Sequence, residues 1–148
     1  MKKITFILLA FTITIGACHQ KLQNTQTKDM NAKYTFENTQ WRLVKIAGAD
    51  SIPKVQKEIF LQFNKMDSSF SGNAGCNNMT GRYTADGNKL SFGPAAMTRM
   101  MCPPEQMNIE NLFTRAINTT DNFIITKENL ELRIGTETLA TFVASYNK

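Results

Sequence analysis

The chain has 148 residues, a length that allows one compact domain with short extensions. Hydrophobic residues make up 42% and charged residues 20%, a composition typical of neither a disordered chain nor an integral membrane protein. The net charge is +5, but residues 34–148 carry 12 Lys and Arg against 11 Asp and Glu, without the basic surplus of a nucleic-acid-binding surface. We therefore expect no nucleic-acid partner.

The first residues have the features of an export signal. Lys2 and Lys3 precede a mostly apolar stretch at residues 4–15, which is shorter than the roughly 20 residues that cross a bilayer but suits a secretion signal. The stretch ends in small residues followed by Cys18 and resembles a bacterial lipobox, whose cysteine is acylated. We expect residues 1–17 to be a lipoprotein signal peptide and Cys18 to carry lipid, including palmitate. The alternative is an ordinary cleaved signal that happens to contain a cysteine.

Residues 18–33 are polar and rich in Gln, Asn, Thr and Lys. Such a segment buries too little apolar surface to offset the entropy of ordering, and it predicts a flexible tether. His19 follows Cys18 where an Asp often marks retention at the inner membrane, so we expect a lipid-anchored protein of the cell envelope, at the outer membrane.

From residue 34 onward, alternating apolar and polar residues between turns predict short antiparallel strands. One hairpin turn is marked by Asp86-Gly87-Asn88. The spacing of about ten residues is typical of a meander. The expected strands are residues 41–46, 59–63, 69–72, 80–84, 89–92, 122–126, 130–134 and 138–143.

One helix is predicted after Pro103 and Pro104, since Pro is favoured at the first helical position. Glu105 and Glu110 are interpreted as acidic residues near its positive end. Apolar residues recur at helical spacing and form one stripe that must lie on the sheet: Ile109, Leu112, Phe113, Ala116 and Ile117. The expected fold of residues 34–148 is α+β, a single domain in which a curved antiparallel meander packs on one amphipathic helix.

Two segments, residues 71–78 and 96–103, carry a family resemblance, and Trp41-Arg42-Leu43 supports it. They resemble the signatures of the META-domain family, especially its bacterial heat-shock lipoprotein (HslJ-like) branch. The resemblance implies a curved sheet wrapped on a helix and an association with envelope stress, including tolerance of the antibiotic novobiocin. It supplies no catalytic residues. The motif positions are Gly72, Asn73, Gly75, Cys76, Asn77, Gly81, Met97, Thr98 and Cys102.

The first motif has the composition of a sharp, buried corner. Gly72, Gly75 and Gly81 allow positive φ or close approach of backbone, and the asparagines tolerate left-handed geometry while bonding nearby backbone. A nest of amides that cradles an anion is the functional alternative.

Cys76 and Cys102 are the two cysteines that remain beside Cys18. In an oxidising compartment such a pair predicts a disulfide, with two buried reduced thiols as the alternative. Four sulfur-containing residues, Met97, Met100, Met101 and Cys102, also suggest a copper site, since soft ligands select Cu(I). Methionines beside a helix commonly fill a core, so we expect no metal and no cofactor.

Residues 34–148 contain no histidine, which disfavours general acid–base catalysis, and we expect no enzyme. The favoured function is a non-catalytic binding or interaction module, tethered to the membrane by lipid and monomeric, with an envelope protein or a small molecule as its partner. The alternatives are a passive lipoprotein that stabilises the envelope and, less favoured, an uncharacterised periplasmic enzyme.

Overall fold

The computed structural model describes residues 34–37, 39–55 and 57–145. The predicted signal peptide, Cys18, His19 and the tether all lie outside the described residues. Among the described residues, no helix has the length and apolar character needed to cross a membrane.

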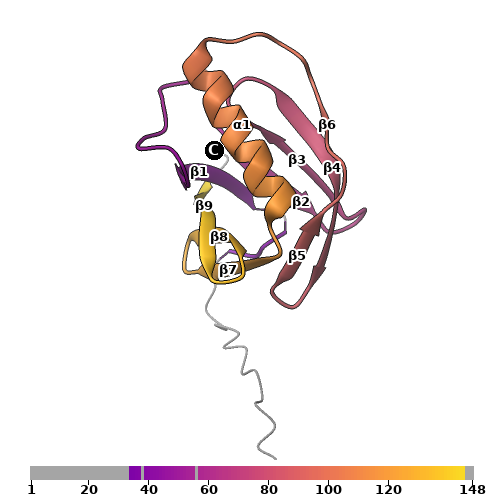
Figure 1. Ribbon diagram of the computed structural model, residues 1–148. Helices are drawn as coiled ribbons and strands as arrows, with labels where there is room; N and C mark the ends of the chain where they lie inside the picture. The colour runs from indigo at the N-terminus through magenta and orange to yellow at the C-terminus, as the bar shows by residue number, and fades with distance from the viewer. Residues whose placement is uncertain (1–33, 38, 56, 146–148) are drawn as a thin grey trace, which may run out of the picture.

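The described chain forms nine strands and one helix (Figure 1). Each predicted strand and the predicted helix is present, with ends shifted by a few residues. The two-residue β6 was not anticipated. The elements are β1 (Gln40–Ile46), β2 (Phe60–Asn64), β3 (Ser69–Asn73), β4 (Asn78–Asp86), β5 (Lys89–Phe92), β6 (Ala96–Met97), α1 (Pro104–Thr119), β7 (Asn122–Thr126), β8 (Asn129–Ile134) and β9 (Glu137–Ser145).

Eight of the strands close into an antiparallel barrel, so the expectation of a curved meander sheet is wrong in this respect. The strands follow one another around the barrel in chain order, with α1 inserted between β5 and β7. The ring closes where the first strand pairs with the last, from Gln40 opposite Ser145 to Ile46 opposite Ala140. Alternation along single strands reports which face is buried but not that distant strands pair, which is why closure was missed.

The barrel is filled by side chains. Alternate residues point inward, and the ring of Phe36 stacks on those of Phe63 and Phe123 at centroid distances of 4.1 and 4.2 Å. An eight-stranded barrel has an interior just wide enough for side chains. The largest fully buried apolar side chains are Trp41, Leu61, Phe63, Phe70, Phe113, Phe142, Ile46, Leu90, Ile117, Leu130 and Leu132.

Leu43 and Val44 are two apolar residues in a row and interrupt the alternation of apolar and polar residues along β1. This interruption has a structural cause. The register between β1 and β9 shifts between Leu43 and Lys45, so Val44 lies at a bulge and is exposed. Ile46 then returns to the inner face and is buried. The break in the pattern thus marks a bulge rather than the end of the strand.

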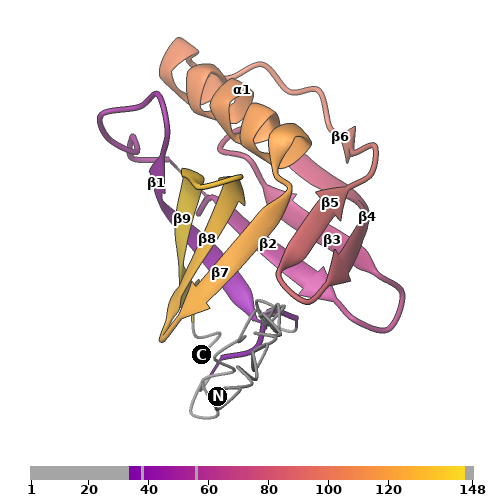
Figure 2. The same ribbon diagram turned by 60° about the horizontal axis from the view of Figure 1, so that its bottom comes forward.

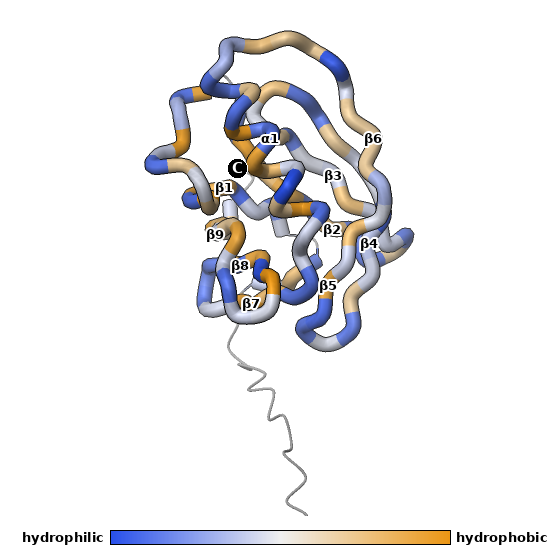
Figure 3. The backbone as a smooth tube through the Cα atoms, in the orientation of Figure 1, coloured by the Kyte–Doolittle hydropathy of each residue, from blue (hydrophilic) through white to orange (hydrophobic). Residues whose placement is uncertain are grey.

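The helix α1 lies across one end of the barrel (Figures 1 and 2). Its Ile109, Phe113, Ala116 and Ile117 are buried, as the apolar stripe predicted, and hydrophobic and hydrophilic colours alternate along it in Figure 3. Leu112 is half-buried and faces Gly48, where an added Cβ would lie 3.1 Å from its Cδ2. The stripe therefore closes one end of the hydrophobic core.

Candidate functional site

The two motif segments lie far apart in the sequence but meet in space. In the first, residues 72–77 run from the end of β3 into a turn and are all buried, and we call them the corner. The second comprises β6 and the connection that follows it to α1. Met79 and Thr80 of β4 pair with Met97 and Ala96, which brings the second segment alongside the corner.

Asn77 is the centre of this contact. Its Oδ1 accepts hydrogen bonds from the Thr98 hydroxyl at 2.8 Å and from the Met100 amide at 2.7 Å. Its Nδ2 donates to the Met100 carbonyl at 3.2 Å and to Oε1 of Glu110 at 3.0 Å. One buried side chain therefore fixes the β6–α1 connection and ties the corner to the helix. Sequence reasoning gave Asn77 only a local backbone role.

Glu110 is the residue that sequence reasoning misjudged. It is not a helix-end charge: only 7% of its surface is exposed, and its Oε2 also accepts the Asn77 amide at 2.7 Å. The signal was its position three residues before Phe113, which places it on the buried face. The corner does present an amide to an anion, as the nest alternative required, but that anion is the protein's own carboxylate.

A disulfide makes the second link between the motifs. Cys76 and Cys102 are bonded, with 5.9 Å between their Cα atoms and 26 residues of separation. The pairing predicted from the sequence is therefore present, and the alternative of two reduced thiols is not. Because both sulfur atoms are in the disulfide, Cys102 is not available as a thiolate ligand. A copper site that includes Cys102 is therefore excluded.

Glycine is required at two corner positions. Gly75 has φ +110°, in the region that favours glycine, and its amide donates to Oδ1 of Asn73 at 2.9 Å. A Cβ on Gly72 would collide with the carbonyl oxygen of Phe60 on β2. Gly81, by contrast, lies farther along β4 against the ring of Phe70, so this motif residue serves barrel packing and not the corner.

A groove of about 700 Å³ lies beside the corner, and we call it the methionine groove. Its walls carry four thioethers, on β6, on the following connection and on α1, with Glu110 among the lining residues. Met100 and Met101 are 49% and 96% exposed, so the expectation that these two methionines fill a core is wrong. The lining residues are Asn77, Ala95, Ala96, Met97, Thr98, Arg99, Met100, Met101, Met107 and Glu110.

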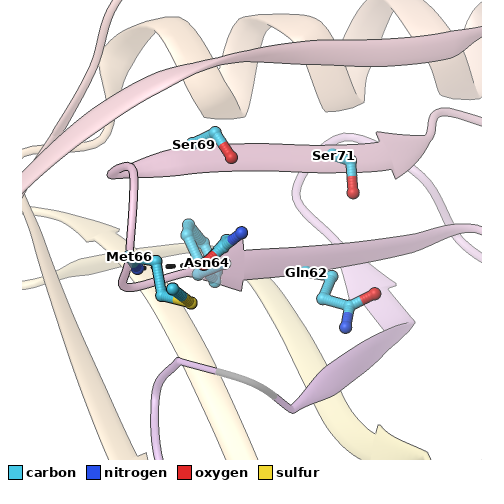
Figure 4. A pocket seen from close by; sticks show the side chains of 6 residues that line it. Gln62, Asn64, Met66, Ser69 and Ser71 are labelled. Carbon is cyan, nitrogen blue, oxygen red and sulfur yellow. Dashed lines mark hydrogen bonds between the residues drawn. The ribbon is translucent and has the colours of Figure 1, made fainter.

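Three smaller depressions of about 410 to 430 Å³ lie elsewhere on the described surface. Figure 4 shows one of them, on the outside of the β2–β3 hairpin, lined by Gln62, Asn64, Ser69, Ser71 and Met66 together with Phe63. Its only drawn contact is local, from the Met66 amide to Oδ1 of Asn64 at 2.9 Å. It gathers no charged side chain. The other two depressions do contain charged residues, but they are smaller than the methionine groove, which also lies where the two sequence motifs meet and is therefore the better candidate site.

The perturbed titratable groups lie away from this groove. Hydrogen bonds from the hydroxyl and amide of Ser69 lower the pKa of Asp67, which lies in the β2–β3 turn. Burial, with smaller contributions from the charges of Glu37 and Asp67, raises the pKa of Tyr83. Within the described residues, no three His, Cys, Asp or Glu side chains are grouped so that they could hold a metal ion.

The fold and the site define a class of protein: a small closed barrel, capped by one helix, with a disulfide-braced groove on its outside. The sequence profile of the META domain matches residues 34–146. The chain therefore belongs to the META-domain family. Membership supports an envelope- or stress-related domain and no more specific activity. No curated protein matches the sequence.

Solved structures show the same fold. A protein from Burkholderia xenovorans, determined by NMR, is 27% identical, with a TM-score of 0.60 over 76% of this chain and 85% of that chain. A second NMR structure is 21% identical, with a TM-score of 0.59 over 74% and 95%. A crystal structure of a DUF4847 family protein from Bacteroides vulgatus is 17% identical, with a TM-score of 0.52 over 76% and 96%.

Proposed function

We propose that this chain is a non-catalytic binding domain, held at the cell envelope by lipid on Cys18, and that the methionine groove is its binding surface. The observation that carries the proposal is the exposure of Met100 and Met101 on a connection fixed by a disulfide and by Asn77. Exposed apolar side chains on a fixed backbone are typical of a contact surface, because binding then has to order the side chains but not the backbone. Methionine suits such surfaces because it is flexible and polarisable.

The barrel interior is a poorer candidate for the binding site. Stacked aromatic rings and branched aliphatic residues fill it, with Phe63, Phe70 and Phe142 almost fully buried. Catalysis is also poorly supported. Residues 34–148 contain no histidine, Cys76 and Cys102 are joined, and Glu110 is held by Asn77 inside the fold. A binding function, by contrast, needs only the exposed methionines and the fixed connection that carries them.

The geometry also fits anchoring through the N-terminal side. β1 begins at Gln40 and runs toward Ile46, after which Gly48 faces Leu112 of α1. The chain therefore enters the barrel at the end opposite α1 (Figure 2). A lipid-anchored domain would hold its α1 end, with the methionine groove, away from the attachment point, and tethering would raise its effective concentration near envelope partners.

The test is complementation of a deletion strain under envelope stress, including novobiocin. Met101→Glu places a charge in the methionine groove, and Met66→Glu places one at an equally exposed site outside it, since the two side chains are 96% and 97% exposed. We expect the first variant to fail and the second to complement. If both complement, the passive, envelope-stabilising function is favoured instead.

Anchoring is tested separately in the same strain. We expect Cys18→Ala to abolish incorporation of labelled palmitate, to release the protein from the outer-membrane fraction and to lose complementation. Labelling that persists in Cys18→Ala, or a protein that stays in the cytosol, would contradict the proposed lipid anchor.

A further inference from the structure

We propose that the methionine groove binds a soft monovalent metal ion, Cu(I), through the thioether sulfur atoms of Met100, Met101 and Met107. This inference rests on the proposed role of the groove as a binding surface and names its ligand. It needs no thiolate and therefore differs from a site built on Cys102, which the disulfide excludes.

The three thioethers lie close enough in the fold to share one ion. Met100 and Met101 lie on the β6–α1 connection and Met107 lies in the first turns of α1, and all three line one groove. Met97 also lines it, but its sulfur lies 3.9 Å from the Thr114 hydroxyl, farther along the helix. The connection itself is held, because the Met100 amide and carbonyl both bond to Asn77. A fixed backbone with flexible thioethers allows convergence on one ion.

The chemistry of these side chains favours Cu(I). Thioethers are soft, neutral ligands that select Cu(I) over hard divalent ions, which prefer oxygen. Three neutral ligands leave the ion's single positive charge uncompensated. Glu110, 93% buried and lining the same groove, supplies a fixed negative charge nearby. Among the described lining residues Arg99 carries a positive charge that would repel the ion. Arg99 is exposed, so solvent screens this repulsion.

Binding requires no redox step. The ion enters as Cu(I), exchanges its previous ligands for thioether sulfur, and leaves the Cys76–Cys102 bond intact. Ag(I), which has the same charge and softness and does not change oxidation state under these conditions, should therefore bind in the same way.

The experiment uses the mature, lipidated chain in detergent micelles, in which Cys18 has no free thiol, with carbon-13 in the methionine methyl groups. Ag(I) and then Cu(I), the latter with ascorbate and a competing chelator, are titrated in separate samples. We expect one ion per chain and shifts of the Met100, Met101 and Met107 methyl resonances. Met79, which is buried in the core, and Met66, which lies outside the groove, should not move.

Leucine substitutions separate coordination from apolar contact, because leucine keeps the volume and loses the sulfur. We expect the double variant Met100→Leu and Met101→Leu to weaken Ag(I) and Cu(I) binding by about tenfold or more, the scale on which even residues around metal ligands act. Met66→Leu should bind like the parent chain. Zn(II) should leave all these methyl resonances unchanged.

The two proposals fail differently. Saturating Ag(I) that shifts no groove methionine, or shifts Met66 equally, overturns the metal site. If the double leucine variant still complements the deletion strain while Met101→Glu does not, the groove serves apolar docking and the metal site is again overturned. If Met101→Glu also complements, the proposed function itself is wrong.

Discussion

Replacing Asn77 by aspartate tests the network that joins the corner to α1. In Asn77→Asp an oxygen takes the place of Nδ2, which donates to Oε1 of Glu110 at 3.0 Å and to the Met100 carbonyl at 3.2 Å. The accepted bonds at Oδ1 can remain. The substitution is nearly isosteric, so its effect reports electrostatics and hydrogen bonding rather than packing.

The size of the destabilisation is set by whichever form of the pair made by the introduced aspartate and Glu110 has the lower free energy in the folded variant: both carboxylates ionised, or the pair holding one proton. Two ionised carboxylates about 3 Å apart would repel by about 5 kcal/mol at an effective dielectric constant of about 20. Keeping a proton on the pair at about pH 7, roughly three units above the ordinary carboxyl pKa, costs about 4 kcal/mol. The protonated pair is therefore favoured, and its proton restores a bond to Glu110. The lost donor to the Met100 carbonyl adds about 1 kcal/mol, so the free energy of unfolding should fall by about 5 kcal/mol at neutral pH.

The loss should depend on pH with a defined sign. The folded variant holds a proton that its unfolded chain releases, so its carboxyl pair has a raised pKa. Such a group contributes stability that is present below the unfolded value, at about pH 4, and is lost as the pH rises. The difference from the parent chain should shrink to about 1 kcal/mol near pH 4.

Urea unfolding followed by fluorescence measures this difference directly, because Trp41 is the single tryptophan and is fully buried. Asn78→Asp is the matched control: Asn78 is exposed, and its Oδ1 accepts a hydrogen bond from the side-chain Nδ2 of Asn73 at 2.9 Å, a bond that aspartate keeps. We expect its stability to change by less than about 1 kcal/mol. A parent-like Asn77→Asp variant, or a loss that does not vary with pH, would refute the proposed contact with Glu110.

Three further predictions use the same unfolding assay or a titration. Reducing the Cys76–Cys102 bond should lower the free energy of unfolding by about 3.5 kcal/mol, from the entropy of a 26-residue loop; an unchanged urea midpoint would contradict this. Gly72→Ala should cost more than about 2 kcal/mol, because its Cβ collides with the Phe60 carbonyl; an unchanged Tm would show that the strands can move apart. The pKa of Tyr83 is raised from 10.0 by burial, so stability should decline as the pH rises past about 10, and Tyr83→Phe should remove part of that decline; an equal decline in Tyr83→Phe would contradict it.

The strands and the helix could be predicted because their signals are local. Period-two alternation placed the strands, and Pro104 with the stripe through Ile109 and Phe113 placed α1. Closure could not be predicted in this way, since it depends on β1 pairing with β9 across almost the whole chain. β6 was also missed, because two residues are too few to show a period.

The site was predictable only in part. The pairing of Cys76 with Cys102 followed from counting cysteines, and the glycines indicated a tight corner. Neither pattern shows that Asn77 reaches across to Glu110, because a contact over 33 residues leaves no periodic trace. The exposure of Met100 and Met101 could not be predicted either, because the sequence around them is compatible with both a core and a surface position.

Barrel closure has a consequence for how copies of this protein coexist. In the described sheet each of the eight barrel strands has a neighbour on both sides, although β5 and β7 share one residue pair, Lys89 opposite Asn122, and β6 supplies a short open edge. Unpaired edges are where sheets join and aggregate, and short ones are poor templates. A protein concentrated on a two-dimensional support could therefore reach high density while remaining as separate molecules, with β6 and the β5–β7 seam as the points where strand-to-strand association would begin.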